Sequence, residues 1–403
     1  MTIRRVPEDF RVEERLRPDV ARALDSSAPA AAGAHAVFRL EKRSLTTPEA
    51  VARLGKCLGV RAGRIDYCGL KDKHAVTIQH ASVPVAELSS TAPPPSQLED
   101  AGIKATFAGY LPYSLRAEHI GVNSFSIVVR DVARTACEEM GRNLEALRIP
   151  DGGAAIINYF GDQRFGSARH GEGFAARHLI RGEFDAALRL LIGTPHRKDS
   201  GVRRAFTRLC AGHWGDWNLL ARDLPRCPQR RAIETLASGG PPRDAFASLP
   251  HGEQVLCVEA YQSHLWNEVA RIMAAALDAP RSIRAADPFG EMIFPPADVL
   301  PGAWVDLEIP SLGPEAALVD PWRGAAERVL EAEGVSLPDL RIPGLRRPAF
   351  GAAPRALVAR ATDVALDEAR PDEITGRGRL KRELTFDLPR GSYATVLLRA
   401  LGQ

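Results

Sequence analysis

The sequence predicts an α+β fold in which one domain is interrupted by an insertion. Three observations lead to this prediction. Strand-like segments and helices occupy both ends of the 403-residue chain, residues 173–277 are mainly helical in pattern, and residues 283–354 are rich in Pro and Gly. At about 150 residues per domain, this length allows two or three domains. We find no internal repeat, which argues against a solenoid or a propeller.

The composition is that of an ordinary globular protein. Hydrophobic residues make up 45% and charged residues 26% of the chain, which excludes a disordered chain, a collagen-like repeat and a small disulfide scaffold. No window offers the ~18 apolar residues of a membrane span, and the start Met-Thr-Ile-Arg-Arg does not resemble a signal peptide. We therefore expect a cytoplasmic protein with no membrane partner.

The cysteines and the net charge say little about binding partners. The six cysteines contain no Cys-x-x-Cys pair, so we expect neither a zinc site nor disulfides. The net charge of +3 does not by itself point to nucleic acid. Only seven of the 53 basic residues are lysines, and two of these, Lys71 and Lys73, flank Asp72.

The N-terminal third begins with an alternating strand over residues 7–14. We expect the acidic residues of this strand, Asp9, Glu13 and Glu14, to lie on a solvated surface. A low-complexity stretch follows at 26–33, and then an apolar strand at 36–40. A helix is predicted over 47–58, with Thr47 as its cap.

Further elements follow from the same two periodicities. Residues 89–99 are predicted to form a loop. The predicted strands cover residues 65–68, 75–83, 124–129, 154–159, 383–388 and 393–399, and the predicted helices cover 133–147, 255–277 and a segment near 322–333.

The first candidate site is the segment 69–79, Gly-Leu-Lys-Asp-Lys-His-Ala-Val-Thr-Ile-Gln. A Gly turn here presents Asp72 between two lysines and beside a histidine, at the junction of two strands. Neighbouring positive charge favours the ionised carboxylate, which suits a nucleophile or a base. The alternative from residue types alone is an exposed, charged hairpin turn.

The second candidate is the segment 158–166, Asn-Tyr-Phe-Gly-Asp-Gln-Arg-Phe-Gly. Its aromatic side chains are suited to stacking on a base, while an amide and a guanidinium bind base edges and phosphate. The alternative is a small aromatic core beneath a glycine loop. A late cluster of Arg and Lys between residues 341 and 382 has the density of a phosphate-binding face, although an ordinary solvated face is nearly as consistent with it.

Taken together, these segments resemble the TruD family of tRNA pseudouridine synthases. The matches follow the family order: Pro-Glu-Asp-Phe at 7–10, the segments 69–79 and 158–166, the helix at 259–267, and Leu-Pro-Arg-Gly-Ser-Tyr-Ala-Thr at 388–395. The family isomerises a uridine of tRNA, typically at position 13, by detaching the base at N1 and rejoining it through C5. The resemblance implies tRNA as the partner and no cofactor or metal.

The resemblance also implies roles for individual residues. Asp72 matches the essential aspartate, which either attacks the sugar C1′ or removes a C2′ proton. Arg4 matches a basic residue that pairs with it, Phe160 matches the aromatic that stacks on the target base, and Asn158 matches a residue that orients the aspartate or the base. Lys71 is expected to be among the substrate-binding residues.

In fold, the resemblance implies a pseudouridine-synthase catalytic domain with a mixed α/β core around an antiparallel sheet, interrupted by a TRUD insertion domain. We place the catalytic domain at 1–184 and 351–403 and the insertion at 185–350, and we expect a monomer that needs no protein partner. The family's Gly-Asn-x-Phe stretch carries one inserted residue, Val122, which leaves RNA contacts there open. Two alternatives remain: a catalytically silent RNA-binding protein of this fold, and a hydrolase that releases the base.

Overall fold

The structure is a computed structural model that describes residues 1–26, 34–88, 94–168, 171–196, 199, 201–277, 280–376 and 378–403. The chain forms two compact units: unit 1 comprises residues 1–156, 296–298 and 359–403, and unit 2 comprises 157–295 and 299–358. Almost all of the low-complexity stretch 26–33 and the first part of the loop 89–99 lie outside the described residues.

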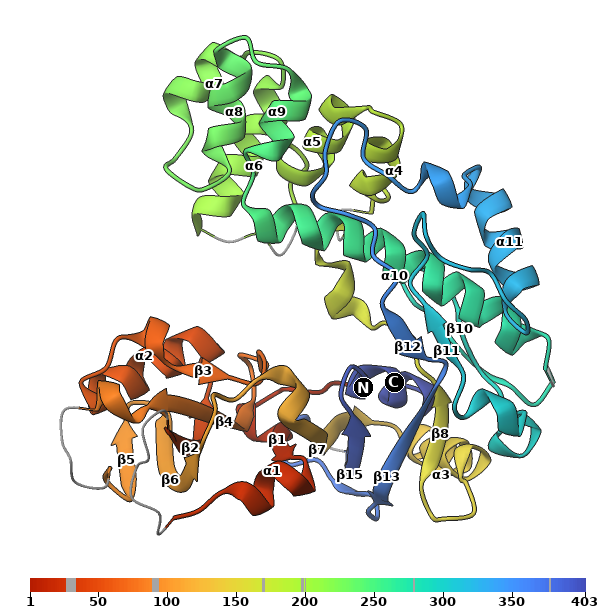
Figure 1. The fold of residues 1–403 in the computed structure, drawn as a ribbon. Helices are drawn as coiled ribbons and strands as arrows, with labels where there is room; N and C mark the ends of the chain where they lie inside the picture. Colours follow the sequence, from red (N-terminus) through yellow and green to blue (C-terminus); the bar gives the residue numbers. More distant parts are fainter. Residues whose placement is uncertain are drawn as a thin grey trace. The chain divides into compact units, whose positions relative to one another are not determined.

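Unit 1 is built on one large mixed sheet (Figure 1). Its strands are β1 (Phe10–Leu16), β2 (His35–Arg43), β3 (Asp66–Tyr67), β4 (Val76–Pro84), β5 (Gln97–Asp100), β6 (Ile103–Leu111), β7 (Ile120–Val132), β8 (Ala154–Ile157), β13 (Val358–Leu366), β14 (Arg370–Pro371) and β15 (Leu380–Pro389). The main path runs β5-β6-β2-β4-β1-β7-β15-β13-β8, with β14 on β15 and β3 on β4. The pairs β2–β4, β2–β6, β1–β7 and β7–β15 are antiparallel, whereas β1–β4 is parallel. The predicted α+β fold class is confirmed.

Two helices of unit 1 cover opposite faces of this sheet. Helix α2 (Thr47–Leu58) buries Leu54 in a core that contains Phe38 of β2. Helix α1 (Pro18–Ala23) buries Val20 in a second core that contains Val37. Because successive side chains of a strand point to opposite faces, these two neighbours on β2 assign α1 and α2 to different faces.

The N-cap of helix α2 lies one residue before the predicted cap. Its N-cap is Thr46, whose hydroxyl accepts a hydrogen bond from the Glu49 N–H in a capping box. Thr47 is instead buried within the first turn, where its hydroxyl is used in contacts outside the helix. The predicted cap at Thr47 is therefore wrong, and this difference is important for the site described below.

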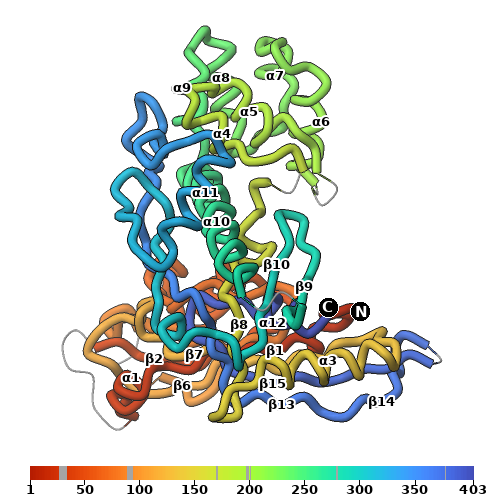
Figure 2. The backbone as a smooth tube through the Cα atoms, turned by 90° about the vertical axis from the view of Figure 1, so that its right-hand side faces the viewer, coloured from red at the N-terminus to blue at the C-terminus, as the bar shows by residue number. Residues whose placement is uncertain are grey.

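The C-terminal segment differs from its prediction in a second way. Residues 393–399, predicted to be a strand, form helix α12 (Ala394–Ala400), which buries Val396, Leu397 and Leu398. A short apolar run is compatible with either a strand or a buried helix, so its period does not decide between them. The predicted helix at 133–147 is confirmed as α3 (Arg134–Leu147). The two chain ends lie side by side in unit 1 (Figures 1 and 2).

Unit 2 is mainly helical and is organised around one long helix (Figure 2). Its helices are α4 (Ala175–Ile180), α5 (Phe184–Ile192), α6 (Gly201–His213), α7 (Trp217–Asp223), α8 (Arg230–Ala237), α9 (Pro242–Ala247), α10 (His251–Ala275) and α11 (Arg323–Glu333). Strands β9 (Ile283–Ala285) and β10 (Met292–Phe294) form one small antiparallel sheet, and β11 (Glu308–Pro310) and β12 (Pro354–Ala356) form another. Helix α10 contacts α4, α9, α11 and β10, and its Trp266 Nε1 donates to the Ile309 carbonyl at 3.0 Å.

The limits of unit 2 differ from the expected limits of the insertion, 185 and 350. Residues 157–184 belong to unit 2 because α4 packs against α5 and α10. Residues 351–358 belong to it because β12 pairs with β11.

Two kinds of feature are absent from the described part of the chain. No helix there is both long enough and apolar enough to cross a membrane. No group of three or more His, Cys, Asp or Glu side chains in the same residues is arranged to hold a metal ion.

Candidate active site

The segment that carries Asp72 and the N-terminal segment that carries Arg4 lie at the same end of the unit 1 sheet. Each precedes a strand of the parallel pair, in which Arg11 of β1 is in register with Val76 of β4. Parallel neighbours begin at the same edge, so the two preceding segments meet there. The Arg4 Nη2 atom lies 2.9 Å from Asp72 Oδ2, and the side chains are 24% and 31% exposed. The carboxylate is thus paired with a guanidinium and still reachable from solvent.

Arg4 is held in an unusual conformation. Its φ angle of 63° lies in the left-handed region, which a residue with a Cβ adopts at a cost of about 1–2 kcal/mol. Its guanidinium stacks over the Phe10 ring at 4.0 Å. Nearby, Asp9 accepts hydrogen bonds from the Val6 N–H at 3.0 Å and from Arg130 Nε at 2.8 Å. These contacts fasten the segment that presents Arg4 to Asp72.

Lys71 points away from solvent and binds Glu14. The two charged groups are 2.6 Å apart, and their side chains are 9% and 0% exposed. Burial alone would raise the pKa of Glu14, but hydrogen bonds from His80 and the charge and hydrogen bond of Lys71 hold that pKa below its ordinary value. The Lys71 ammonium is therefore already bound inside unit 1, which favours a role in shaping the loop over the direct substrate contact that we expected.

The backbone of the same loop is also fastened. The Lys71 N–H donates to Thr47 Oγ1 at 3.0 Å, and this hydroxyl donates in turn to Gln79 Oε1 at 2.9 Å. Lys42 Nζ, from β2, donates to the Asp72 carbonyl at 2.6 Å. The loop is thus tied to β2, β4 and α2 by polar contacts.

Unit 2 carries Phe160 on a rigid support. The side-chain amide of Asn267 on α10 holds the Phe160 peptide at both ends: Oδ1 accepts from the Phe160 N–H at 2.8 Å, and Nδ2 donates to its carbonyl at 3.0 Å. The Arg355 guanidinium stacks over the Phe160 ring at 3.9 Å, and Trp266 meets this ring edge to face at 5.6 Å. Phe160 is 8% exposed.

Asn158 is part of the same support. Its Nδ2 donates to the Ala356 carbonyl at 3.0 Å, and its Oδ1 accepts from Arg355 Nη2 at 2.9 Å. The Arg355 Nε also donates to the Asn158 carbonyl at 2.9 Å. The amide of Asn158 therefore fixes the guanidinium that stacks on Phe160.

The structure brings Arg4, Lys71 and Asp72 together in unit 1, and Asn158 and Phe160 together in unit 2. It corrects the expectation of a solvated acidic surface, because Asp9 and Glu14 are 1% and 0% exposed.

Four members of these sites were not predicted from the sequence: Lys42, Glu14, Asn267 and Arg355. A signal was present for two of them, because Glu14 follows Phe10 and Val12 on one strand face, and Lys42 follows Phe38 and Leu40. A charged residue that continues an apolar face indicates a buried, paired charge.

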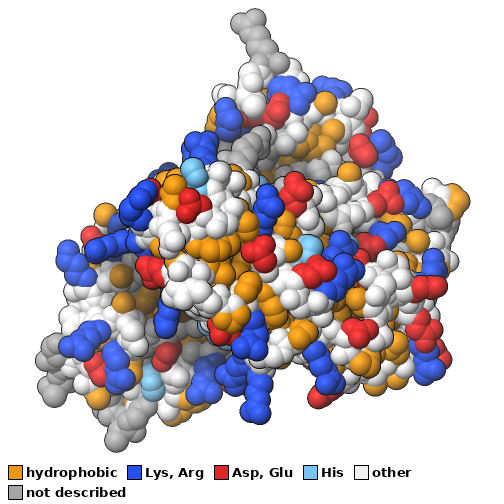
Figure 3. Space-filling view, turned by 90° about the horizontal axis from the view of Figure 1, so that it is seen from above, with side chains coloured by type: hydrophobic (Ala, Val, Ile, Leu, Met, Phe, Trp, Pro, Cys, Tyr) orange, Lys and Arg blue, Asp and Glu red, His pale blue; other side chains and the backbone are white. Residues whose placement is uncertain are grey.

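The late basic cluster is distributed over both units. Arg355 supports Phe160 in unit 2, whereas Arg360 and Arg379 pair with Asp151 and Asp131 in unit 1. On the face shown in Figure 3, Lys and Arg side chains are interspersed with Asp and Glu among the described residues. Much of this positive charge is therefore locally balanced.

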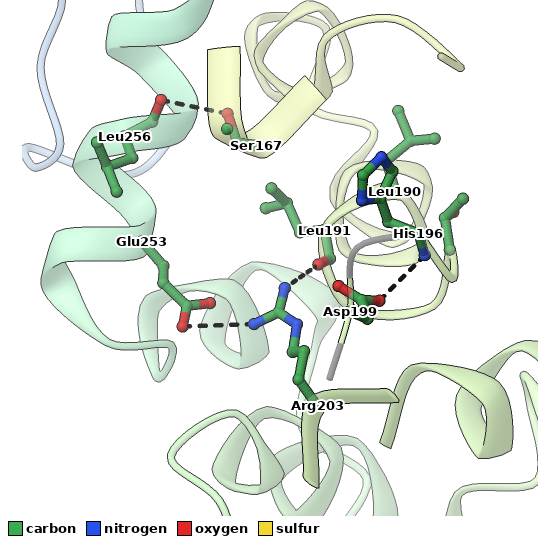
Figure 4. A pocket seen from close by; sticks show the side chains of 10 residues that line it. Ser167, Leu190, Leu191, His196, Asp199, Arg203, Glu253 and Leu256 are labelled. Atoms are coloured by element: carbon green, nitrogen blue, oxygen red, sulfur yellow. Dashed lines mark hydrogen bonds and ion pairs between the residues drawn. The ribbon is translucent and has the colours of Figure 1, made fainter. Parts of the chain in front are cut away.

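A separate pocket in unit 2 is a weaker candidate (Figure 4). Its volume is about 260 Å³, and its charged groups include Asp199, Arg203 and Glu253. Arg203 donates to the Leu191 carbonyl at 3.0 Å and lies 3.6 Å from Glu253. Among the described lining residues, the one arginine, Arg203, is already engaged and faces two acidic groups, an arrangement that does not favour phosphate binding.

Comparison with known proteins places this site in a family. Residues 1–281 match the profile of tRNA pseudouridine synthase D, TruD. The chain belongs to the TruD family. It is 30% identical to the tRNA pseudouridine synthase D of Aquifex aeolicus over 99% of this chain and 97% of that protein. It is also 30% identical to that of Anaeromyxobacter dehalogenans strain 2CP-1, over 99% and 92%.

A solved structure supports the fold of this TruD-family chain. A Methanosarcina mazei protein assigned to TruD superposes with a TM-score of 0.68 over 99% of this chain and 92% of that chain, at 23% identity. The matched range 1–281 includes Arg4, Asp72, Phe160 and Asn267. Arg355, which supports Phe160, lies beyond it.

Proposed function

We propose that this chain isomerises a uridine of tRNA, at position 13, to pseudouridine, with Asp72 as the reacting carboxylate. The observation that carries the proposal is the Asp72 carboxylate, which is held on a fastened loop, paired with Arg4 and partly open to solvent, within a chain of the TruD family. Names of the relatives support tRNA as the substrate.

The proposed reaction exchanges one bond for another. The N1–C1′ bond breaks, a C5–C1′ bond forms, the C5 proton leaves and N1 gains a proton, so that the product is an isomer of the substrate. Asp72 either attacks C1′ or removes a C2′ proton in the first step, and the same carboxylate is the base for the C5 proton in the last. Arg4 orients the carboxylate through the ion pair at 2.9 Å.

The target base must leave its stack to reach a carboxylate, as in other enzymes that act on bases. We assign Phe160 to stacking on the extruded uridine, with Asn158 as the residue that fixes its support. Lys71 we assign to shaping the loop through Glu14. The side chains here need no cofactor or metal for this reaction, and we propose that the chain acts as a monomer in the cytoplasm.

The test is tritium release from tRNA transcripts that carry 5-tritiated uridine, with the product mapped by position. Wild type should release tritium from position 13. Asp72→Asn should release none and still bind tRNA, because the change removes charge and little volume. Asp66→Asn, an exposed aspartate six residues earlier in the chain, is the matched control and should behave as wild type.

Other outcomes of this assay would contradict the proposal or indicate a different activity. Tritium release by Asp72→Asn would contradict the role of the carboxylate. Product at another position would contradict position 13. Free uracil would indicate a hydrolase, and tight binding by a wild type that releases no tritium would indicate a silent RNA-binding protein.

For Phe160→Ala we expect a loss of about 1–3 kcal/mol in binding of the target base, seen as a lower kcat/KM. Unchanged kinetics would argue against stacking.

A further inference from the structure

Lys42 is a fully buried lysine beneath the Asp72 loop. It lies near the end of β2 and is 0% exposed, on the strand face that also buries Phe38 and Leu40. Burial lowers the pKa of Lys42 to about 8, and the nearby charge of Asp72 partly opposes this change. A buried ammonium is costly unless it is paired and hydrogen-bonded, so its contacts indicate what it does.

The ammonium binds two backbone carbonyls. Lys42 Nζ donates to the Asp72 carbonyl at 2.6 Å and to the Leu45 carbonyl at 2.7 Å. The carbonyl carbon and the side chain of Asp72 are bonded to the same Cα atom. Holding that carbonyl therefore restricts the rotation of the Asp72 peptide and the direction of the Cα–Cβ bond.

Apolar packing contributes little to holding this loop in place. Leu70, two residues before Asp72, is 71% exposed. The preceding peptide is anchored through Lys71, whose N–H binds Thr47 and whose ammonium binds Glu14. The Asp72 peptide itself is anchored by Lys42, which donates to its carbonyl.

We propose that Lys42 is a positioning residue for the reaction, which fixes the Asp72 carboxylate by holding the carbonyl of the same residue. The inference rests on the proposed function of Asp72. Lys42 does not need to touch the RNA, because its charge and its donors act through the loop.

The test compares Lys42→Met with wild type in single-turnover tritium release, together with the thermal midpoint. Methionine has a similar length, no charge and no donor. A misplacement of about 1 Å can cost about 100-fold in rate, so we expect the limiting rate to fall about 100-fold. The RNA concentration for half-saturation should stay within about threefold.

Two control variants separate positioning from lost stability. Lys104→Met removes a lysine from β6, the strand beside β2, and should leave the rate unchanged. Leu144→Ala empties a buried site on α3 and should lower the thermal midpoint while keeping the limiting rate within about threefold. If Lys42→Met gives no folded protein, Lys42→Leu, which also has no charge and no donor, takes its place with the same criteria.

The result that would overturn the inference is a limiting rate for Lys42→Met within threefold of wild type while Asp72→Asn is inactive. A loss no larger than that of Leu144→Ala would overturn it equally. If Asp72→Asn itself is active, the proposed function has failed instead, so the two failures are distinguishable.

Discussion

Replacing Asn267 by Leu tests the support of Phe160 directly. The change keeps the size of the side chain and removes the amide that binds both the Phe160 N–H and its carbonyl. Both contacts are buried. A buried backbone group without a partner costs about 1–3 kcal/mol, and the similar volume keeps any cavity small. We therefore expect unit 2 to lose about 2–4 kcal/mol of unfolding free energy.

Tryptophan fluorescence is a selective probe for this experiment. All five tryptophans, at positions 214, 217, 266, 304 and 322, lie in unit 2. In urea, an m-value of about 2 kcal/mol per M converts the expected loss into a decrease of about 1–2 M in the unfolding midpoint. The kcat/KM for tritium release should fall as well, because the Phe160 ring loses its fixed position.

A control on the same unit makes the result interpretable. Asn218 on α7 is exposed, and Asn218→Leu should change the unfolding free energy by less than about 0.5 kcal/mol. A midpoint for Asn267→Leu that matches that of Asn218→Leu would refute the reasoning, since the Phe160 peptide would then not depend on the amide.

Three further predictions concern buried charge and thiol exposure. Burial raises the pKa of Glu333, but hydrogen bonds from α4 and α10 outweigh the effect of burial and bring the pKa to about 2. The ionised carboxylate therefore stabilises unit 2 by about 3 kcal/mol above pH 4.5. This stabilisation is lost as the pH falls towards 2. Urea titrations should show Glu333→Gln destabilised at pH 7 and nearly equal to wild type near pH 2, whereas a pH-independent difference would contradict the ion pair. Arg130→Met leaves Asp9 and Asp372 buried without their partner. Calorimetry should show that the free energy of unfolding falls by about 3–5 kcal/mol. An unchanged free energy of unfolding would mean that other groups pair with both carboxylates. Cys57, exposed in the native fold, should react first with a thiol reagent, and Cys57→Ser should remove this fast phase. A persistent fast phase would mean that another thiol, such as the half-buried Cys227, reacts equally fast.

The sequence was sufficient to predict those elements whose structure depends on residues close together in the chain. Helices α2, α3 and α10 and strands β1, β2 and β4 follow from periodicity, because their apolar positions repeat within one element. The motif around Asp72 and the segment around Phe160 were also evident from residue types and order. The strand predicted at 393–399 failed because a short apolar run does not distinguish a strand from a buried helix, and packing against the rest of unit 1 decides between them.

Burial and pairing were decided only by the tertiary structure. Arg4 and Asp72 are 68 positions apart in the sequence, and they meet because β1 and β4 pair in parallel. Glu14 was predicted to be solvated, yet it is buried on Lys71, which turns that lysine away from solvent.

The sequence by itself therefore determined most of the elements and indicated the residues that we propose for the chemistry. The tertiary structure decided which charges are buried and which partners hold them, including the contacts of Lys42 with the Asp72 carbonyl and of Asn267 with Phe160. The physical reason is range: propensity and capping act over a few residues, whereas desolvation and ion pairing depend on groups that only the completed fold brings within 3 Å.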